Sequence, residues 1–347
     1  CAHGGRGWRG GLGDASFSSY GILKPEVFVM ESRPSLTRRD FVRRSSSCAA
    51  QVALMKAVAP LWGQMVWATQ DRFPVVASEP WGRLERIAPG VWGLVSTPLE
   101  DRTTLCNGGI ISGRNGVVIV EAFASNDGAR WMTEQARRLT GRRPTHTVIT
   151  HYHGDHTDGL RGMVETPGVE VLGTDVTIDL SMQNGDEQSE VLETVTRIGT
   201  RRPTEIDLGD RSVILVPRRG HTQSDLTVEI PEESVVFCGD LVWNQMVPNY
   251  VDAAPSRLSA EARLLRAMDA STYVPGHGPL ADAMALDRYI DLLGDIEAAA
   301  RKAMDRGISS EQAGEEYRIP DGLGDWYAFQ PTYFATAIGA WMSELEE

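Results

Sequence analysis

The chain has 347 residues, 41% of them hydrophobic, with 34 basic and 47 acidic residues and a formal net charge of −13. This length and composition allow one large domain or two ordinary ones, and no run of about 20 apolar residues indicates a multi-spanning membrane protein. The acidic balance disfavours nucleic-acid binding, because neutralising phosphates requires a basic surface.

The first 68 residues are expected to form a disordered tail and an export signal. Residues 1–29 are rich in Gly and Ser, so Met30 is the expected natural start. Thr37-Arg38-Arg39-Asp40-Phe41 resembles a twin-arginine motif, and an apolar stretch and the small-residue pattern Val66-Trp67-Ala68 follow it. These features predict a periplasmic or secreted protein. The alternative is a basic amphipathic helix on the surface.

Residues 69–347 are predicted to form the folded domain. The first 68 residues hold 9 of the basic and 4 of the acidic residues, which leaves 25 basic and 43 acidic residues and a net charge of −18. Cys106 and Cys238 are the cysteines in this part, and both lie in apolar, strand-like runs. An oxidising compartment permits them to pair, but this setting favours buried free thiols.

The domain reads as two similar halves, each with several strands followed by helices. Strands are predicted at 84–87, 91–97, 105–111, 117–120, 145–150, 169–173, 213–217, 226–230, 235–238 and 273–275, with a hairpin at Asn115-Gly116. Helices are predicted at 128–139, 256–268 with Ser256 as its cap, 281–306 and 330–347, and residues 175–198 are a mostly helical lid or crossing helix, broken near Asn184-Gly185. This order predicts an α+β fold, a four-layer αββα sandwich of two sheets with helices outside.

Metal-capable side chains gather at the ends of the predicted strands. His151, His153, Asp155 and His156 follow the strand at 145–150 within six residues. The other candidates, each beside a glycine at a strand end, are His221, Asp240 and His277. Neutral imidazoles and carboxylates suit Zn²⁺, with Fe and Mn as further candidates, and a buried cluster of this kind needs a cation.

In order, these motifs resemble the signature of the metallo-β-lactamase superfamily, over roughly residues 81–280. The signature is His-x-His-x-Asp-His, a Gly-His, an Asp at a strand end and a second Gly-His. The resemblance implies the αββα fold and two zinc ions per chain: His151, His153 and His221 as ligands of the first, Asp155, His156 and His277 as ligands of the second, and Asp240 as their bridge. Glu121 stands where the family usually has an Asp that supports the His-rich turn.

The resemblance also implies a zinc-dependent hydrolase. A metal-bound hydroxide would attack a carbonyl carbon, and Asp155 would be the catalytic residue that orients the nucleophile or moves a proton. Asp240 in place of a Cys, with no Lys at 241–244, favours a lactone, thioester or other ester as the small-molecule substrate. Export and the sequence at 220–225 are lactamase-like, so a β-lactam amide stays open as a substrate.

Two other activities on the same fold are weighed against hydrolysis. A mononuclear iron, persulfide-dioxygenase-like enzyme would leave the second metal site empty, and a nuclease is disfavoured by the charge of −18. Tyr152, Trp243, Asn244 and Tyr250 either line the substrate cleft or pack in the ordinary way. No integral membrane association and no nucleic-acid partner are expected, and the oligomeric state is left open.

Overall fold

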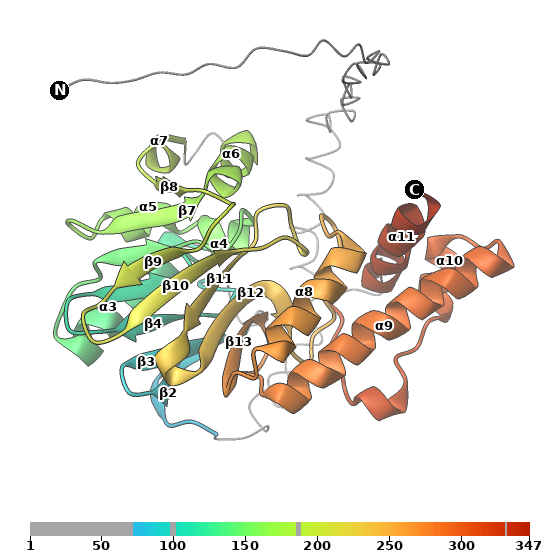
Figure 1. Cartoon of the computed structure of the whole chain (residues 1–347), viewed down its shortest axis with the longest axis horizontal. Helices are drawn as coiled ribbons and strands as arrows, with labels where there is room; N and C mark the ends of the chain where they lie inside the picture. The colour runs from blue at the N-terminus through green and yellow to red at the C-terminus, as the bar shows by residue number, and fades with distance from the viewer. Residues whose placement is uncertain (1–71, 98–101, 185–188, 330–331) are drawn as a thin grey trace, which may run out of the picture.

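The computed structural model describes residues 72–97, 102–184, 189–329 and 332–347 (Figure 1). The predicted tail and export signal in residues 1–68 lie outside the described residues, as does Gly185 at the predicted break. Two β-sheets lie at the centre of the described part, and helices lie on the outside of each sheet (Figure 1).

The first sheet runs in sequence order from β1 to β8. Its strands are β1 (Val75–Glu79), β2 (Gly82–Ala88), β3 (Val91–Ser96), β4 (Gly108–Ser112), β5 (Val117–Val120), β6 (His146–Val148), β7 (Glu170–Thr174) and β8 (Thr196–Ile198). Neighbours from β1 to β5 are antiparallel, and those from β5 to β8 are parallel. Parallel strands end at the same edge, so β6 delivers the residues that follow it to the edge where β7 and β8 also end.

The second sheet has the order β13-β12-β11-β10-β9. Its strands are β9 (Thr204–Asp207), β10 (Ser212–Pro217), β11 (Leu226–Ile230), β12 (Val235–Trp243) and β13 (Thr272–His277). The pairs from β9 to β12 are antiparallel, whereas β12 and β13 are parallel. β12 is buried along all nine residues, as expected for a strand that is covered on both faces.

Helices follow the strands in each half of the described chain. They are α3 (Asn126–Thr140), α4 (Gly154–Thr157), α5 (Leu160–Val164), α6 (Asp175–Asn184), α7 (Ser189–Leu192), α8 (Pro255–Ala267), α9 (Ala283–Arg306), α10 (Ser310–Glu316) and α11 (Thr332–Glu346), with single 3₁₀ turns η1 (Pro231–Glu233) and η2 (Asp321–Leu323). Among the described helices, none has the length and apolar content needed to cross a bilayer.

Three apolar clusters define the four layers. Between the sheets, Val118 of the first sheet belongs to the same buried cluster as Val228 of the second. Ile119, which points to the other face of β5, joins Met132 of α3 in the outer cluster of the first sheet. The outer cluster of the second sheet is formed by β12 with α8, α9 and α11. The predicted αββα sandwich is therefore confirmed, and the alternation along β5 shows why its sequence is an unbroken apolar run.

Several local predictions were wrong at element boundaries. β4 begins at Gly108 rather than at 105, because Leu105 has a φ of +59° that a strand does not allow. Residues 196–198, predicted as helical, form the edge strand β8. α8 begins at Pro255 with Ala254 at its N-cap, so Ser256 lies inside the first turn and does not cap the helix. The prediction of buried free thiols at both cysteines is confirmed.

Candidate metal centre

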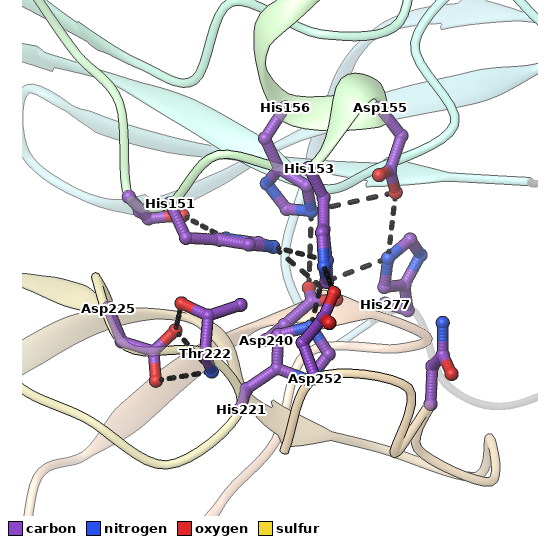
Figure 2. A network of polar contacts seen from close by, with 12 residues as sticks. His151, His153, Asp155, His156, His221, Thr222, Asp225, Asp240, Asp252 and His277 are labelled. Atoms are coloured by element: carbon purple, nitrogen blue, oxygen red, sulfur yellow. Dashed lines mark hydrogen bonds and ion pairs between the residues drawn. The ribbon is translucent and has the colours of Figure 1, made fainter. Parts of the chain in front are cut away.

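Three histidine side chains meet where β6 and β10 end (Figure 2). His151 and His153 lie just beyond β6, and His221 lies in the loop between β10 and β11. Nδ1 of His153 lies 3.1 Å from Nε2 of His151 and 3.0 Å from Nε2 of His221. The three ring nitrogens therefore face a common point, which is where the sequence predicts the first metal ion.

Asp155, His156 and His277 form a second group beside the first. The single turn of α4 presents Asp155 and His156, and His277 is the last residue of β13. Oδ2 of Asp155 lies 3.1 Å from Nε2 of His277 and 3.6 Å from Nε2 of His156. Figure 2 shows these three side chains pointing toward one another from opposite sides.

Asp240 lies between the two groups and faces each with a different oxygen. Its Oδ2 is 3.3 Å from Nε2 of His221, and its Oδ1 is 3.2 Å from Nε2 of His156 and 3.4 Å from Nε2 of His277. The pairing of β12 with β13 shifts at Gly239, which has a φ of +52°. A bulge of this kind re-aims the side chain beside it, so the irregularity in β12 places a strand carboxylate between the groups.

The donor set fits a pair of divalent cations. Ligand atoms about 2.1 Å from a tetrahedral zinc ion lie about 3.4 Å apart, and the measured separations between nitrogen and oxygen atoms around the first position are 3.0–3.9 Å. Nε2 of His156 and Oδ1 of Asp240 are buried and face each other at 3.2 Å, but neither makes a hydrogen bond of good geometry within the described residues. Buried polar atoms without a partner are costly, so a cation between them would stabilise the site.

The electrostatics of the site also call for positive charge. Burial lowers the pKa of His151 far below its ordinary value and that of His221 to about 3, so both rings are neutral and can bind a metal. Burial opposes a proton on His277, but Asp240 and Asp155 outweigh it and raise the pKa of His277 to about 9. Without a metal, a proton on His277 balances these carboxylates, which is the role that a cation would take over.

Glu121 supports one histidine of each group. Oγ1 of Thr150 donates to Oε1 of Glu121 at 2.6 Å and lies 3.0 Å from Nδ1 of His151. Since the hydroxyl proton goes to Glu121, the Thr150 oxygen accepts from His151 and leaves Nε2 of that ring free for a metal. Oε1 of Glu121 also lies 3.1 Å from Nδ1 of His156. The family resemblance implied a supporting role at this position, with a solvated carboxylate as the alternative; Glu121 is 2% exposed, and the part that Thr150 takes was not foreseen.

Asp252 is a supporting residue that the sequence did not indicate. Its Oδ2 lies 3.1 Å from Nε2 of His153, so this nitrogen donates and Nδ1 is left to face the metal position. Burial opposes the ionisation of Asp252, but hydrogen bonds from His153 and Tyr152 outweigh it and hold the pKa of Asp252 below its usual value. Asp252 is 99 residues away from His153, and no spacing rule connects the two.

Asn107, also not predicted, holds the end of β13, where His277 lies. Its Nδ2 donates to the carbonyl oxygens of Pro275 at 3.0 Å and Gly278 at 2.7 Å, which joins the first sheet to the end of β13. A Cβ atom at Gly276 would collide with Oδ1 of Asp240, so the residue before His277 must be glycine. The glycines of the motif were a usable signal for this close approach, whereas a lone asparagine was not.

Of the four side chains that the sequence analysis considered for the substrate cleft, three are buried and one is partly exposed. Trp243, Asn244 and Tyr250 are buried, and Nδ2 of Asn244 donates to the carbonyl oxygen of Pro279 at 3.0 Å. These three therefore pack in the protein interior and do not line a solvent-exposed cleft. Tyr152 remains partly exposed, and its ring lies edge-on to that of His153 with centroids 4.9 Å apart.

The structure thus combines a four-layer αββα fold with seven convergent His and Asp side chains that could hold metal ions. The sequence profile of the metallo-beta-lactamase superfamily matches residues 102–277, which is half of the chain. The chain therefore belongs to the metallo-β-lactamase superfamily. It is hydrolase-like, and its described residues hold His and Asp groups that could bind metal.

Comparisons with individual proteins agree with this family. The chain is 27% identical over 194 residues to a metallo-beta-lactamase type 2 of Bacillus sp. (strain 170), covering 54% of this chain and 72% of that protein. It is 25% identical over 222 residues to the 2,4-dinitroanisole O-demethylase subunit alpha of Nocardioides sp. (strain JS1661), covering 62% and 67%. It is also 26% identical over 122 residues to a hydroxyacylglutathione hydrolase of Erythrobacter litoralis, covering 35% and 43%.

Solved structures show the same fold. A metallo-beta-lactamase from Pontibacter korlensis superposes with a TM-score of 0.52 at 22% identity, covering 61% of this chain and 99% of that one. The sec-alkylsulfatase Pisa1 from Pseudomonas sp. superposes with a TM-score of 0.58 at 14% identity, covering 75% and 49%. At these identities the likeness concerns the fold alone.

Proposed function

We propose that the protein is an exported binuclear zinc hydrolase that cleaves a small carbonyl compound. The observation that carries this proposal is Asp240, whose two oxygens face two separate and complete groups of ligand atoms. Zinc ions held there would polarise a carbonyl group and acidify a water molecule. The second group disfavours the mononuclear iron alternative, because that enzyme would have no use for Asp155, His156 and His277 together.

The protein's own residues have distinct tasks in this reaction. Asp155 is 27% exposed at its side chain, whereas His156 is fully buried and His277 is 6% exposed, so within the second group Asp155 is the ligand that can reach water or substrate. Its carboxylate, ionised beside His156 and His277, can accept a proton from the nucleophile or hold it in place. Asp252 and Glu121 keep the imidazoles in the tautomers that metal binding requires.

The proposed substrate is a lactone, thioester or ester, with a β-lactam as a further candidate. The chain has Asp240, not a cysteine, and no lysine at 241–244 that would bind a drug carboxylate. Relatives named as metallo-beta-lactamase and hydroxyacylglutathione hydrolase support hydrolysis at a carbonyl carbon. The charge of −18 over residues 69–347 supports a small-molecule partner over nucleic acid.

The proposed activity is tested by metal content and turnover together. The purified protein is expected to contain two zinc ions per chain and to hydrolyse one of three compounds: a lactone, a thioester or a chromogenic β-lactam. Asp155→Ala and His221→Ala are expected to lower turnover by more than about 100-fold, whereas Asp127→Ala, an exposed residue of α3, should leave it unchanged. One iron per chain, or full turnover by both site variants, would contradict the proposal.

Export is tested by a charge-conserving change in the motif. Twin-arginine signals depend on the guanidinium pair itself, so Arg38→Lys with Arg39→Lys is expected to keep the protein in the cytoplasm. Arg43→Lys with Arg44→Lys is a matched control that alters a neighbouring pair. The measurement is the fraction of protein in the periplasm by immunoblot, and equal fractions for both variants and the parent would rule out twin-arginine export.

A further inference from the structure

A segment beyond the family-matched region is attached beside the second ligand group. The match ends at residue 277, and the chain continues through α9 and α10 before it returns to the site. Tyr327 pairs with Met246 in a parallel β-bridge. The backbone N–H of Tyr327 donates to Gln245 at 2.9 Å, and that of Val247 donates to Tyr327 at 2.8 Å. The C-terminal segment is thus fixed to the loop that follows β12.

This attachment brings the ring of Phe329 to a metal-site histidine. The centroid of Phe329 lies 6.4 Å from that of His277 and 6.2 Å from that of Trp243, with interplanar angles of 84° and 88°. Trp243 lies against His277 with centroids 4.1 Å apart, and Tyr327 lies 5.6 Å from Phe329. His277 is therefore next to two aromatic rings, Trp243 and Phe329, and Phe329 in turn contacts Tyr327 and Tyr333; we call Trp243, Phe329 and Tyr327 the aromatic wall of His277.

Exposure separates the members of this wall. Trp243 and His277 are 3% and 5% exposed, so they are covered by protein on nearly every side. Phe329 and Tyr327 keep a partly exposed surface, as does Asp155, which lies 3.1 Å from His277. On the other side of the site, the partly exposed groups are His153, Asp252 and Tyr152, whose ring lies against that of His153. The partly exposed aromatic side chain beside the first ligand group, Tyr152, is thus hydrogen-bonded to Asp252, whereas the ring of Phe329 beside the second group carries no polar atom.

We propose that Phe329 contacts the substrate and that the substrate carries an aryl group, which binds against this ring beside the second ligand group. The inference rests on the proposed function, because it needs a metal-bound ligand to place the aryl group. A partly exposed ring next to the reacting centre gains contact when a second ring covers it, and such aromatic pairs strengthen binding up to about 10-fold. A group without a ring would leave the exposed part of the Phe329 ring uncovered.

The test compares two thiols that bind metals and differ in their apolar group. Phenylmethanethiol and 2-mercaptoethanol are titrated into the zinc-loaded full-length protein by calorimetry. Phe329→Ala is expected to weaken binding of phenylmethanethiol about 10-fold and to leave 2-mercaptoethanol unchanged. The Phe329→Tyr variant keeps an aromatic ring, so it is expected to bind phenylmethanethiol in preference to 2-mercaptoethanol, as the parent protein does. Phe334→Ala is the matched control. Phe334 lies on α11 and is also partly exposed, but its ring packs against that of Tyr317, the residue that follows α10.

Metal content separates the other outcomes. If Phe329→Ala loses zinc, the ring only supports His277 and the inference is wrong, as it is if both thiols weaken equally or neither changes. In those cases the proposed function stands as long as the parent protein binds two zinc ions. If the parent binds neither zinc nor thiol, the proposed function fails and the inference fails with it.

Discussion

Replacing Asp240 with asparagine is expected to reduce the metal content from two ions per chain to one or fewer and to lower turnover by more than about 100-fold. Loss of a supporting residue typically costs about 10- to 100-fold in metal affinity, and Asp240 is a direct ligand candidate for both ions. Its oxygens lie 3.2 Å from Nε2 of His156 and 3.3 Å from Nε2 of His221. A neutral amide also removes the buried negative charge that favours cations at this position.

The measurement is zinc per chain by plasma emission spectrometry, with turnover on the same preparation. Glu229→Gln is the matched control, because Glu229 is a partly buried carboxylate of the same sheet as Asp240, 2.9 Å from Arg218 and outside both ligand groups. The control should keep two zinc ions. Two zinc ions in the Asp240→Asn protein would show that this carboxylate does not bridge the site.

The ligand groups could be predicted because their signals are local. Four of the seven side chains lie within six consecutive residues, and each of the other three directly follows a glycine, although Asp240 lies inside β12 and not at its end as predicted. The interior strands were also predictable, since β5 and β12 are covered on both faces and read as continuous apolar runs. Burial on both faces favours apolar residues, and in β12 the buried Asp240 is the exception that the metal centre explains.

The remaining features depend on tertiary contacts that have no local signal. β1 is mostly exposed, so it lacks the apolar pattern by which its neighbours were found. Asn107 acts on Pro275 across 168 residues, and Asp252 acts on His153 across 99. Phe329 reaches His277 only because Tyr327 pairs with the loop after β12. A single asparagine, aspartate or phenylalanine has many ordinary roles, and only the folded chain shows which role applies.

Glu121→Gln is expected to weaken both metal positions, whereas Thr150→Val is expected to weaken chiefly the first. Oε1 of Glu121 faces Nδ1 of His156 at 3.1 Å and accepts from Oγ1 of Thr150 at 2.6 Å. An amide carries no charge to hold His156, and its own protons disturb the hydrogen bond from Thr150. Thr150→Val removes the hydroxyl that orients His151 but leaves Glu121 opposite His156. Each affected affinity should fall about 10- to 100-fold.

Competition with a chromogenic chelator measures the two zinc affinities separately in each variant. Thr147→Val is the matched control, because Oγ1 of Thr147 is buried and has no hydrogen-bond partner among the described residues, so its loss should not change either affinity. If Glu121→Gln and Thr150→Val weaken the same single position, Glu121 acts through Thr150 and His151 alone. If both bind zinc as the parent does, the histidines keep their orientation without Glu121, and the strand-end carboxylate is a folding feature rather than part of the metal centre.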